Sequence, residues 1–341
     1  LHSFPARRSS DLMSGVYEAM RVAAHRVPGS IEWMDDPATF RDRFVCEDGA
    51  DRWYFTVYAA GDLERGETRF GLTDEAGKLN ANWATEAMLS KLQSLTPYLA
   101  QGLADFLDAD DLARPEGAEQ EYYDTLPNPY AVRNGPLETF EELRLVRGFT
   151  PQVLYGEDAN LNFTLDPNED DGEEQFPLDN KDGKLDPGLR HWLTVYSHDL
   201  NEDNDGLPRN DLNFSDDTLA GATLPPALVS FVELCRSNKV TFEHAADLLE
   251  AKAKVKDEQG KEVEIESGVG KDELPVALDF FTATNAQILP GLINVNTASK
   301  EVLQCLPDVD EGLAEAIVTT RQTLSAEQRR TPAWLFQEDL V

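Results

Sequence analysis

The sequence has few cysteines and no long apolar run. Cys46, Cys235 and Cys305 have no metal-binding spacing, and an odd, sparse set is not a disulfide framework. We expect three buried small hydrophobic side chains, with one disulfide and one free thiol as the alternative. No run of 18 or more apolar residues occurs, so the sequence predicts no transmembrane helix within these 341 residues.

Basic residues are scarce relative to acidic ones. Lys and Arg number 30 and Asp and Glu number 64, which gives a formal net charge of −34. Nucleic-acid binding requires clustered Lys and Arg on phosphate, and docking on an anionic membrane surface requires the same. The sequence therefore predicts that nucleic acid is not a partner.

Sequence motifs of common enzymes are missing. There is no H-E-x-x-H, no G-x-S-x-G, no Walker motif and no dinucleotide-binding glycine pattern, and only five histidines. Paired carboxylates are abundant enough to leave a hydrolase open, but nothing in the sequence singles out one pair. We expect that the protein is not an enzyme.

What is present points to folded domains beneath an acidic surface. Apolar residues make up 41% of the chain, too many for a disordered acidic tail, and the length suits about two domains. The first twelve residues, LHSFPARRSSDL, are basic where the rest is acidic, and we interpret 1–12 as a foreign or out-of-frame leader. We also expect the chain to be a fragment at both ends.

Apolar periodicity predicts short helices and strands along the chain. Thr139, with Glu142 three residues on, has the capping-box pattern for one of these helices. The predicted helices are 13–27, 84–92, 99–107, 137–146, 227–234 and 242–253, the predicted strands are 52–62, 67–75 and 193–197, the hairpin is 254–273, and the acidic loop is 160–188.

An internal repeat relates two distant segments. Residues 77–106, shifted by 214, align without a gap on 291–320, with eight identities where about two are expected by composition. Each copy predicts two short helices joined by a turn and preceded by an extended Asn-x-Asn. The second Asn, or Thr85 and Thr297 nearby, is expected to cap the first helix.

The segments that carry chemistry resemble one family. They are TDEAGKLNAN (Thr73–Asn82), LADFLDADD (Leu103–Asp111), RPEGAEQEYY (Arg114–Tyr123) and NPYAVRNGPLETFEELRLVRGF (Asn128–Phe149). Together with the second repeat copy, they resemble the K-type minor pseudopilin of bacterial type II secretion systems, general secretion pathway protein K. Phe106 stands where that family has Trp, which is a mild departure.

The resemblance implies an α+β fold. A pilin-like helix and a small antiparallel sheet would be interrupted by a large helical insertion containing two helix-hairpin-helix, SAM-like repeats. The expected segments are 13–76 for the pilin-like part, 77–190 for the first helical domain, 191–287 for a strand plus mixed helical part, and 288–341 for the second helix-hairpin-helix module.

The resemblance also implies function. Members of the family cap the periplasmic tip of the pseudopilus together with the I- and J-type minor pseudopilins, and an N-terminal helix anchors them in the inner membrane. The alternatives are a competence-type helix-hairpin-helix DNA-binding protein and a calcium-stabilised extracellular binding module.

Two acidic loops are candidate Ca²⁺ sites, because hard oxygen ligands suit this ion. The first offers Asp108, Asp110, Asp111, Glu116 and Glu119, closed by Asn134, and the family resemblance implies calcium in this insertion. The second, Asn201, Asp203 and Asp205 with Gly206, matches half of an EF-hand loop, although Leu212 stands where the loop needs an acid. Asp179–Gly183 and Asp170–Glu173 form a further oxygen-rich stretch, and solvated turns are the alternative for all of them.

Overall fold

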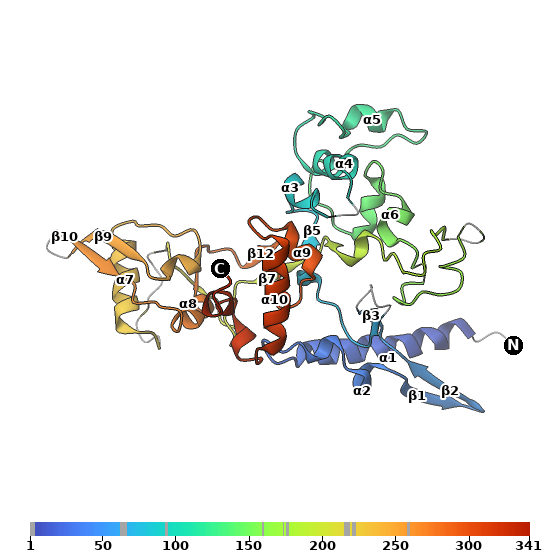
Figure 1. The fold of residues 1–341 in the computed structure, drawn as a ribbon, viewed down its shortest axis with the longest axis horizontal. Helices are drawn as coiled ribbons and strands as arrows, with labels where there is room; N and C mark the ends of the chain where they lie inside the picture. Colours follow the sequence, from blue (N-terminus) through green and yellow to red (C-terminus); the bar gives the residue numbers. More distant parts are fainter. Residues whose placement is uncertain are drawn as a thin grey trace. The chain divides into compact units, whose positions relative to one another are not determined.

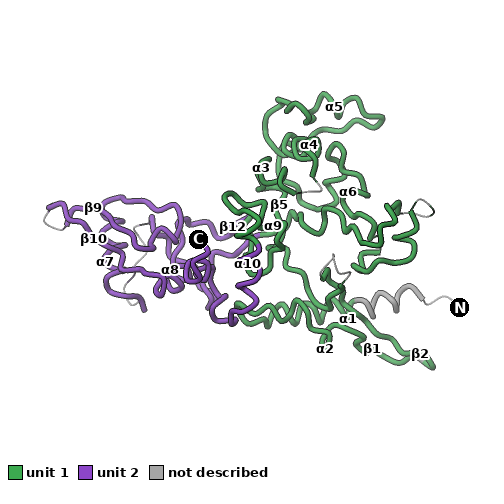
Figure 2. Tube along the Cα trace, in the orientation of Figure 1, with its two compact units in different colours: residues 1–197, 291–314 green, residues 198–290, 315–341 purple. Residues whose placement is uncertain are grey.

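The computed structural model describes residues 4–61, 67–92, 95–158, 160–172, 174, 177–214, 219, 223–257 and 260–341, without the side chains of 4–12 and 48. Residues 62, 93–94, 173, 175–176 and 258–259, which belong to segments predicted above, lie outside the described residues. The chain forms two compact units (Figure 2), unit 1 from 1–197 and 291–314, and unit 2 from 198–290 and 315–341.

In unit 1, a long helix lies against a β-hairpin (Figure 1). Helix α1 (Phe4–Ala24) packs on β2 (Asp51–Phe55), which pairs antiparallel with β1 (Arg43–Asp48). Gly15 permits this contact, because a Cβ there would lie 3.2 Å from the ring of Phe55. The helix predicted at 13–27 is confirmed, and it ends at Ala24.

The two strands predicted at 52–62 and 67–75 are much shorter in the structure. The first divides into β2 and β3 (Ala59–Ala60), and the second shrinks to β4 (Thr68–Arg69), which pairs with β3. Beyond β4 the backbone bonds elsewhere, since the Phe70 carbonyl accepts from Asp36 and the Leu72 amide donates to Trp33. The hydrogen bonds that a longer strand needs are therefore already used by the turn around η1 (Glu32–Met34) and α2 (Pro37–Phe40).

The first repeat copy begins with η3 (Glu75–Gly77) and β5 (Leu79–Asn80), and β5 pairs in parallel with β6 (Leu193–Thr194). It continues through α3 (Glu86–Leu89) and α4 (Pro97–Leu107), and their threonine N-caps, Thr85 and Thr96, accept from backbone amides. Apolar side chains of both helices and of the turn between them form the core, namely Leu89, Leu92, Leu99, Leu103 and Phe106.

After α4, the chain makes short helices around that core. They are α5 (Gln120–Asp124), η4 (Phe140–Leu145), α6 (Pro151–Tyr155) and η5 (Leu189–His191). The helix predicted at 137–146 forms as the shorter 3₁₀ helix η4, but the predicted cap is wrong, because the Thr139 side chain accepts no hydrogen bond from a backbone amide. The Thr139 hydroxyl instead donates to Glu142 at 3.3 Å.

The second copy has the same two helices in order, α9 (Lys300–Cys305) followed by α10 (Glu311–Thr323). In both copies the first Asn makes an Asx turn, since Asn80 accepts from the Asn82 amide and Asn294 from the Asn296 amide. The caps are Thr85 and its aligned partner Ser299. The prediction that Thr297 caps a helix is wrong, because its hydroxyl donates to Asp74 instead.

The two copies pack on each other reciprocally within unit 1, where α3 contacts α9. A Cβ on Gly77 would lie 2.9 Å from the Thr297 hydroxyl, and one on Gly291 would lie 2.6 Å from Cβ of Trp83. Gly77 and Gly291 are equivalent positions, and so are Thr297 and Trp83. The repeat in the sequence therefore corresponds to a repeated contact in the fold.

Unit 2 has an apolar core that includes Phe231, Val232, Leu248, Leu274 and Phe281. Its strands pair as β7 (His198–Leu200) with β12 (Ile288–Pro290), β8 (Asn210–Asp211) with β11 (Phe281–Thr282), and β9 (Lys252–Lys256) with β10 (Glu262–Glu266). Its helices are α7 (Pro226–Ser237), η6 (Ala245–Leu248), α8 (Leu274–Phe280), η7 (Gln328–Arg330) and α11 (Trp334–Gln337).

The predicted hairpin in unit 2 is confirmed, with strands at 252–256 and 262–266. The helix predicted at 242–253 is wrong beyond one short turn, since only η6 forms there. The residues from Lys252 onward instead alternate in β9, whose Val255 side chain is buried while the three lysines are exposed.

None of the three cysteines, all of which are described, forms a disulfide, so the alternative of a disulfide is wrong. Cys235 and Cys305 are buried, and burial raises the pKa of each thiol to about 11. Among the described residues, no helix combines the length and apolarity needed to cross a membrane.

Candidate functional site

Asp105 is an acid on the buried face of α4. It lies between Leu103 and Phe106 and is 0% exposed. A buried carboxylate requires compensating donors, and Arg114 supplies them. The Arg114 backbone amide donates to Oδ2 of Asp105 at 3.1 Å, and its Nη1 donates to Oδ1 at 2.5 Å.

Arg114 ties together three carboxylates from separate parts of the chain. Its Nη1 also bonds Oδ2 of Asp108 at 2.7 Å, and its Nε lies 3.3 Å from Oε2 of Glu86 on α3. Hydrogen bonds to Asp108 and Asp105 raise the pKa of the guanidinium further above its ordinary value. The segment after α4 is thus fastened to both helices of the first repeat copy.

Glu119 completes the cluster from the start of α5. Tyr123 is fully buried, its ring packs edge-on against Phe106 at 5.6 Å, and its hydroxyl accepts from the Arg147 amide. This packing fixes α5, and Glu119 immediately precedes it. One carboxylate oxygen each from Asp105, Asp108 and Glu119 lies within 4.8 Å of the others.

Among the described residues, no hydrogen-bond donor faces the carboxylate of Glu119. It is 5% exposed, and both of its carboxylate oxygens are buried without a hydrogen-bond partner, as is Oδ1 of Asp108. Burial raises the pKa of Glu119 to about 7, and the charges of Asp105 and Asp108 add to this effect. The site therefore presents three buried oxygens with no donor facing them.

Gly117 is required by the closeness of the loop to Asp105. A Cβ at this position would lie 1.8 Å from Oδ2 of Asp105, so no other residue fits without moving the carboxylate. The Gly117 carbonyl accepts from Nη1 of Arg147 at 2.7 Å. The glycine of the R-P-E-G-A-E segment thus sets the distance between the loop and α4.

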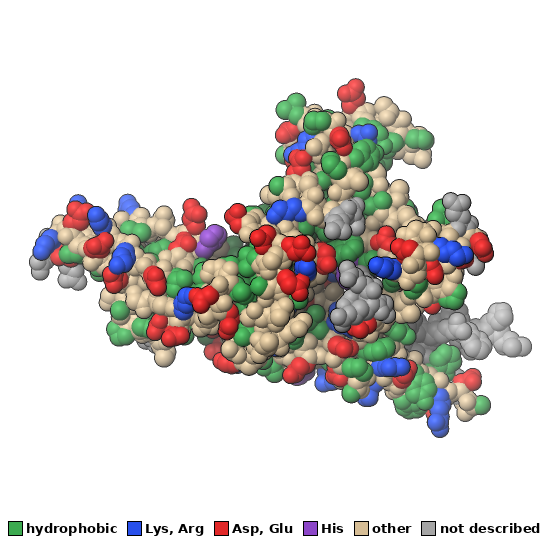
Figure 3. Space-filling model, viewed as in Figure 1, with side chains coloured by type: hydrophobic (Ala, Val, Ile, Leu, Met, Phe, Trp, Pro, Cys, Tyr) green, Lys and Arg blue, Asp and Glu red, His purple; other side chains and the backbone are tan. Residues whose placement is uncertain are grey.

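The structure brings together two of the five residues predicted in this loop, Asp108 and Glu119. Asp110, Asp111 and Glu116 are exposed, and Oδ1 of Asp110 accepts from the Leu112 amide. Figure 3 shows such acidic side chains scattered over the face drawn. Within the described range, the only group of three metal-type side chains found is Asp105, Asp108 and Glu119.

Sequence reasoning missed Asp105 and Arg114. The signal for Asp105 was an acid inside α4, two residues after Leu103 and directly before Phe106. The signal for Arg114 was a lone cation in an acidic stretch. Asn134, which was expected to close the loop, has a φ of 44° and a buried Oδ1 without a hydrogen-bond partner. Two residues earlier, the Val132 amide donates to the side chain of Gln120, the residue after Glu119.

The second predicted calcium loop is a tight hairpin in unit 2. Glu202 bridges to Pro208, and Oδ1 of Asp203 accepts from the amides of Asp205 and Leu207. Asn201 is buried, and its Nδ2 donates to the carbonyls of Thr284 and Ala286. Asp203 therefore stabilises its own turn, while Asp205 is exposed.

The oxygen-rich stretch around Asp179 also bonds to its own backbone. The Asp179 carboxylate accepts from the amides of Asp171, Gly172 and Lys181, and Asp170 accepts from Gly183. Glu173, the last residue of the predicted set, lies outside the described residues. The 160–188 segment is a loop wherever it is described, as predicted.

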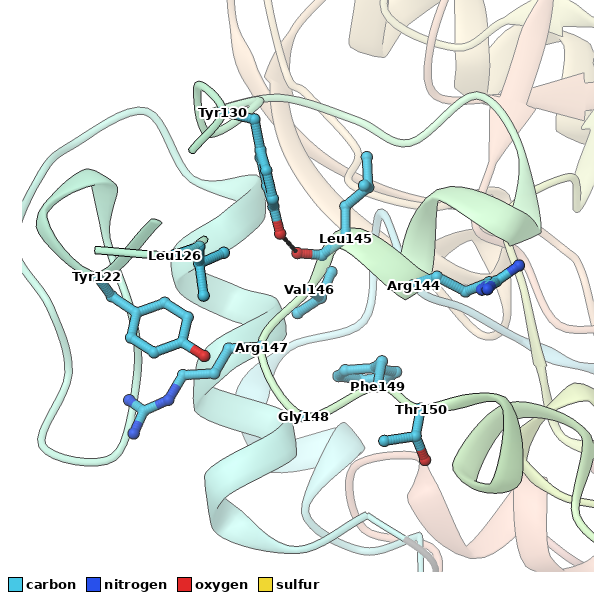
Figure 4. A pocket seen from close by; sticks show the side chains of 10 residues that line it. All are labelled: Tyr122, Leu126, Tyr130, Arg144, Leu145, Val146, Arg147, Gly148, Phe149 and Thr150. Atoms are coloured by element: carbon cyan, nitrogen blue, oxygen red, sulfur yellow. Dashed lines mark hydrogen bonds between the residues drawn. The ribbon is translucent and has the colours of Figure 1, made fainter. Parts of the chain in front are cut away.

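A small cavity is lined by residues between Tyr122 and Thr150 (Figure 4). Its volume is about 200 Å³, and its lining includes Tyr122, Tyr130 and Phe149. The Tyr130 hydroxyl donates to the Leu145 carbonyl at 2.5 Å. The Arg147 guanidinium stacks 4.7 Å from the ring centres of both Tyr98 and Tyr122.

The carboxylate oxygens of the acidic cluster are the type of ligand that a hard divalent cation prefers. Ca²⁺ binds six to eight oxygens at 2.3–2.6 Å, and carboxylates are its common ligands in proteins. Asp108 and Glu119 offer three unpartnered buried oxygens, and Asp105 stands beside them. No nitrogen or sulfur ligand belongs to this group, which disfavours zinc or copper.

Comparison with known proteins places this site in a family domain. Residues 71–155 match the family model described as type II secretion system (T2SS), protein K. This segment is therefore similar to the protein K domain. The matched range contains β5, α3, α4, α5 and the whole acidic cluster, so the resemblance seen in the sequence is confirmed there.

The remaining comparisons are sparse. No curated protein matches the chain. Among solved structures, the crystal structure of the GspK-GspI-GspJ complex from the enterotoxigenic Escherichia coli type 2 secretion system matches at 16% identity, with a TM-score of 0.26. The match covers 42% of this chain and 55% of that chain, so it spans about half the length of the protein it resembles.

Proposed function

We propose that the chain is the K-type minor pseudopilin of a type II secretion system, a structural component without catalytic activity. The observation that carries this proposal is the match of residues 71–155 to the protein K family model. In this role the protein works in the periplasm, at the tip of the pseudopilus, with I- and J-type minor pseudopilins. An N-terminal helix anchors the full-length protein to the inner membrane.

The surface of α1 supports a contact with partner helices. Met13, Val16, Tyr17 and Met20 recur at helical spacing and are 40%, 47%, 63% and 61% exposed. Gly15, on another side of the helix, packs on Phe55. An apolar stripe of this kind needs a cover in water, and a helix of a neighbouring pseudopilin would provide it.

Co-purification with the I- and J-type minor pseudopilins of the same bacterium tests this function. We expect the wild-type chain to form a stable complex and the double variant Val16→Asp with Met20→Asp to lose it, because two charges would be buried at the contact. Leu112→Asp is the matched control, since Leu112 is 78% exposed on a different surface of unit 1. A wild-type chain that binds neither partner would contradict the function, whereas an unaffected double variant would contradict only the α1 contact.

We also propose that the cluster of Asp105, Asp108 and Glu119 binds Ca²⁺. The ion would neutralise carboxylates that otherwise repel each other, and it would join α4 to the start of α5. Asp108 and Glu119 would be the direct ligands, because their buried oxygens have no other partner. The loops at 201–205 and 179–183 remain weaker candidates.

A melting series with EDTA, Mg²⁺ and Ca²⁺ tests this site. Millimolar Ca²⁺ should raise the melting temperature by mass action, and Mg²⁺ should do less because it dehydrates reluctantly. Glu119→Gln should remove most of the gain, whereas Asp110→Asn, at an exposed turn residue, should keep it. An equal Ca²⁺ response in Glu119→Gln would move the site to another loop.

A further inference from the structure

The acidic cluster contains its own cation, and this cation uses part of the oxygen set. Nη1 of Arg114 bonds Oδ1 of Asp105 at 2.5 Å and Oδ2 of Asp108 at 2.7 Å. The second oxygen of Asp105 accepts from the Arg114 backbone. Arg114 therefore occupies both oxygens of Asp105 and one of Asp108.

The oxygens that remain are too few for a complete site. Of the six oxygens of these three carboxylates, only Oδ1 of Asp108 and the two oxygens of Glu119 are buried without a partner, while Ca²⁺ takes six to eight ligands. A guanidinium bonded to two of the three carboxylates also places a positive charge within a few ångströms of any ion bound there. Two like charges at that distance repel strongly in a partly buried site.

We propose that Arg114 is a built-in competitor of the divalent cation. When the cation binds Asp105, Asp108 and Glu119, the guanidinium leaves Asp105 and Asp108 and stays with Glu86. This inference rests on the proposed calcium site.

Glu86 is placed to receive the displaced side chain. Its Oε2 already lies 3.3 Å from Nε of Arg114, and its Oε1 accepts from Nε2 of Gln101 on α4. The Arg114 side chain is about one-third exposed, so it can turn toward α3 without crossing the core. A guanidinium has five donors, so it can exchange one carboxylate for another.

The exchange couples the cation to the first repeat copy. Without the cation, one arginine links α3, α4 and the loop after α4. With the cation, the ion links α4 to the start of α5, and Arg114 links only the loop to α3. The cation thus changes which elements are fastened to each other while the apolar core stays in place.

Calorimetric titration of Ca²⁺ into the full chain and into Arg114→Gln tests the proposal. Glutamine removes the competing charge, so we expect the Ca²⁺ dissociation constant to fall by at least tenfold and the melting temperature in EDTA to drop. Arg114→Lys keeps the charge and should bind Ca²⁺ within about threefold of wild type. Arg133→Gln is the matched control, because Arg133 pairs with Glu138 and Glu142, outside the cluster, and it should leave the constant unchanged.

The outcomes separate this inference from the calcium proposal. If wild type binds Ca²⁺ and the dissociation constant of Arg114→Gln is the same or higher, the competition is overturned and the proposed calcium site stands. Absence of binding in both proteins overturns both. If Arg114→Gln does not fold, Glu86→Gln replaces it: loss of the acceptor for the displaced guanidinium should weaken Ca²⁺ binding severalfold, and unchanged binding overturns the proposal.

Discussion

At the scale of single residues, Glu119 decides how the site responds to pH. Its pKa of about 7 lies above the ordinary 4.5 because the carboxylate is buried beside Asp105 and Asp108, while Arg114 is bonded to those two residues. Between pH 4.5 and 7 the folded chain therefore binds a proton that the unfolded chain has already lost. The contribution of Glu119 to stability is present at low pH and is lost as the pH rises through about 7.

Chemical denaturation in EDTA at pH 5 and pH 7.5 checks this sign. From pH 5 to pH 7.5, the free energy of unfolding of wild type should include a decrease caused by Glu119. This decrease should be absent in Glu119→Gln. Glu116→Gln, at an exposed position in the same loop, should behave as wild type. A larger decrease in Glu119→Gln than in wild type would contradict the account.

Residue identity alone could predict only part of this site. Five acids of one loop were candidates, and the structure keeps Asp108 and Glu119 because Asp108 is the C-cap of α4 and Glu119 the N-cap of α5. Asp110 and Asp111 differ from Asp108 in the sequence only by position, so their exposure could not be predicted without knowing where α4 ends. Asp105 was hidden because it belongs to the helix and not to the loop.

At the scale of elements, the reciprocal contact of the two repeat copies should be sensitive to the smallest addition. Gly77→Ala places a Cβ 2.9 Å from the Thr297 hydroxyl and 3.1 Å from its backbone carbon. We expect this variant to lower the free energy of unfolding by about 1–3 kcal/mol, the usual effect of overpacking. Thermal melting is the measurement.

Gly135→Ala is the control for this variant. Its nearest neighbour would be a carbonyl oxygen at 3.7 Å, which is ordinary contact, so its melting temperature should stay within a degree or two of wild type. Equal melting temperatures for wild type and Gly77→Ala would mean that the two copies do not pack as described.

The elements divide clearly into those that the sequence predicts and those that it does not. Helices with threonine or serine caps and apolar periodicity, such as α4 and α9, were found because local residues determine them. The strand predicted at 67–75 failed because its amides and carbonyls bond to the turn at 33–36, a tertiary contact that no local pattern contains. At η4 the sequence predicted a helix but not its 3₁₀ form.

At the scale of the whole molecule, chain order and spatial grouping differ. The central part of unit 2 runs from 198 to 290, between the two stretches that make up unit 1. Residues 291–314 belong to unit 1 with the first copy, while 315–341 belong to unit 2. A mixed α and β architecture was predictable from the types of element. The repeat related 291–320 to 77–106 in sequence, but it did not predict that the two copies pack on each other.

The central claim is that this chain serves type II secretion as a protein K component, and deletion of its gene tests that claim most directly. The measurement is the amount of the bacterium's type II substrates in the culture medium and in the periplasm. We predict that deletion moves these substrates from the medium to the periplasm and that a plasmid copy of the gene restores their release. Unchanged secretion in the deletion strain would contradict the account.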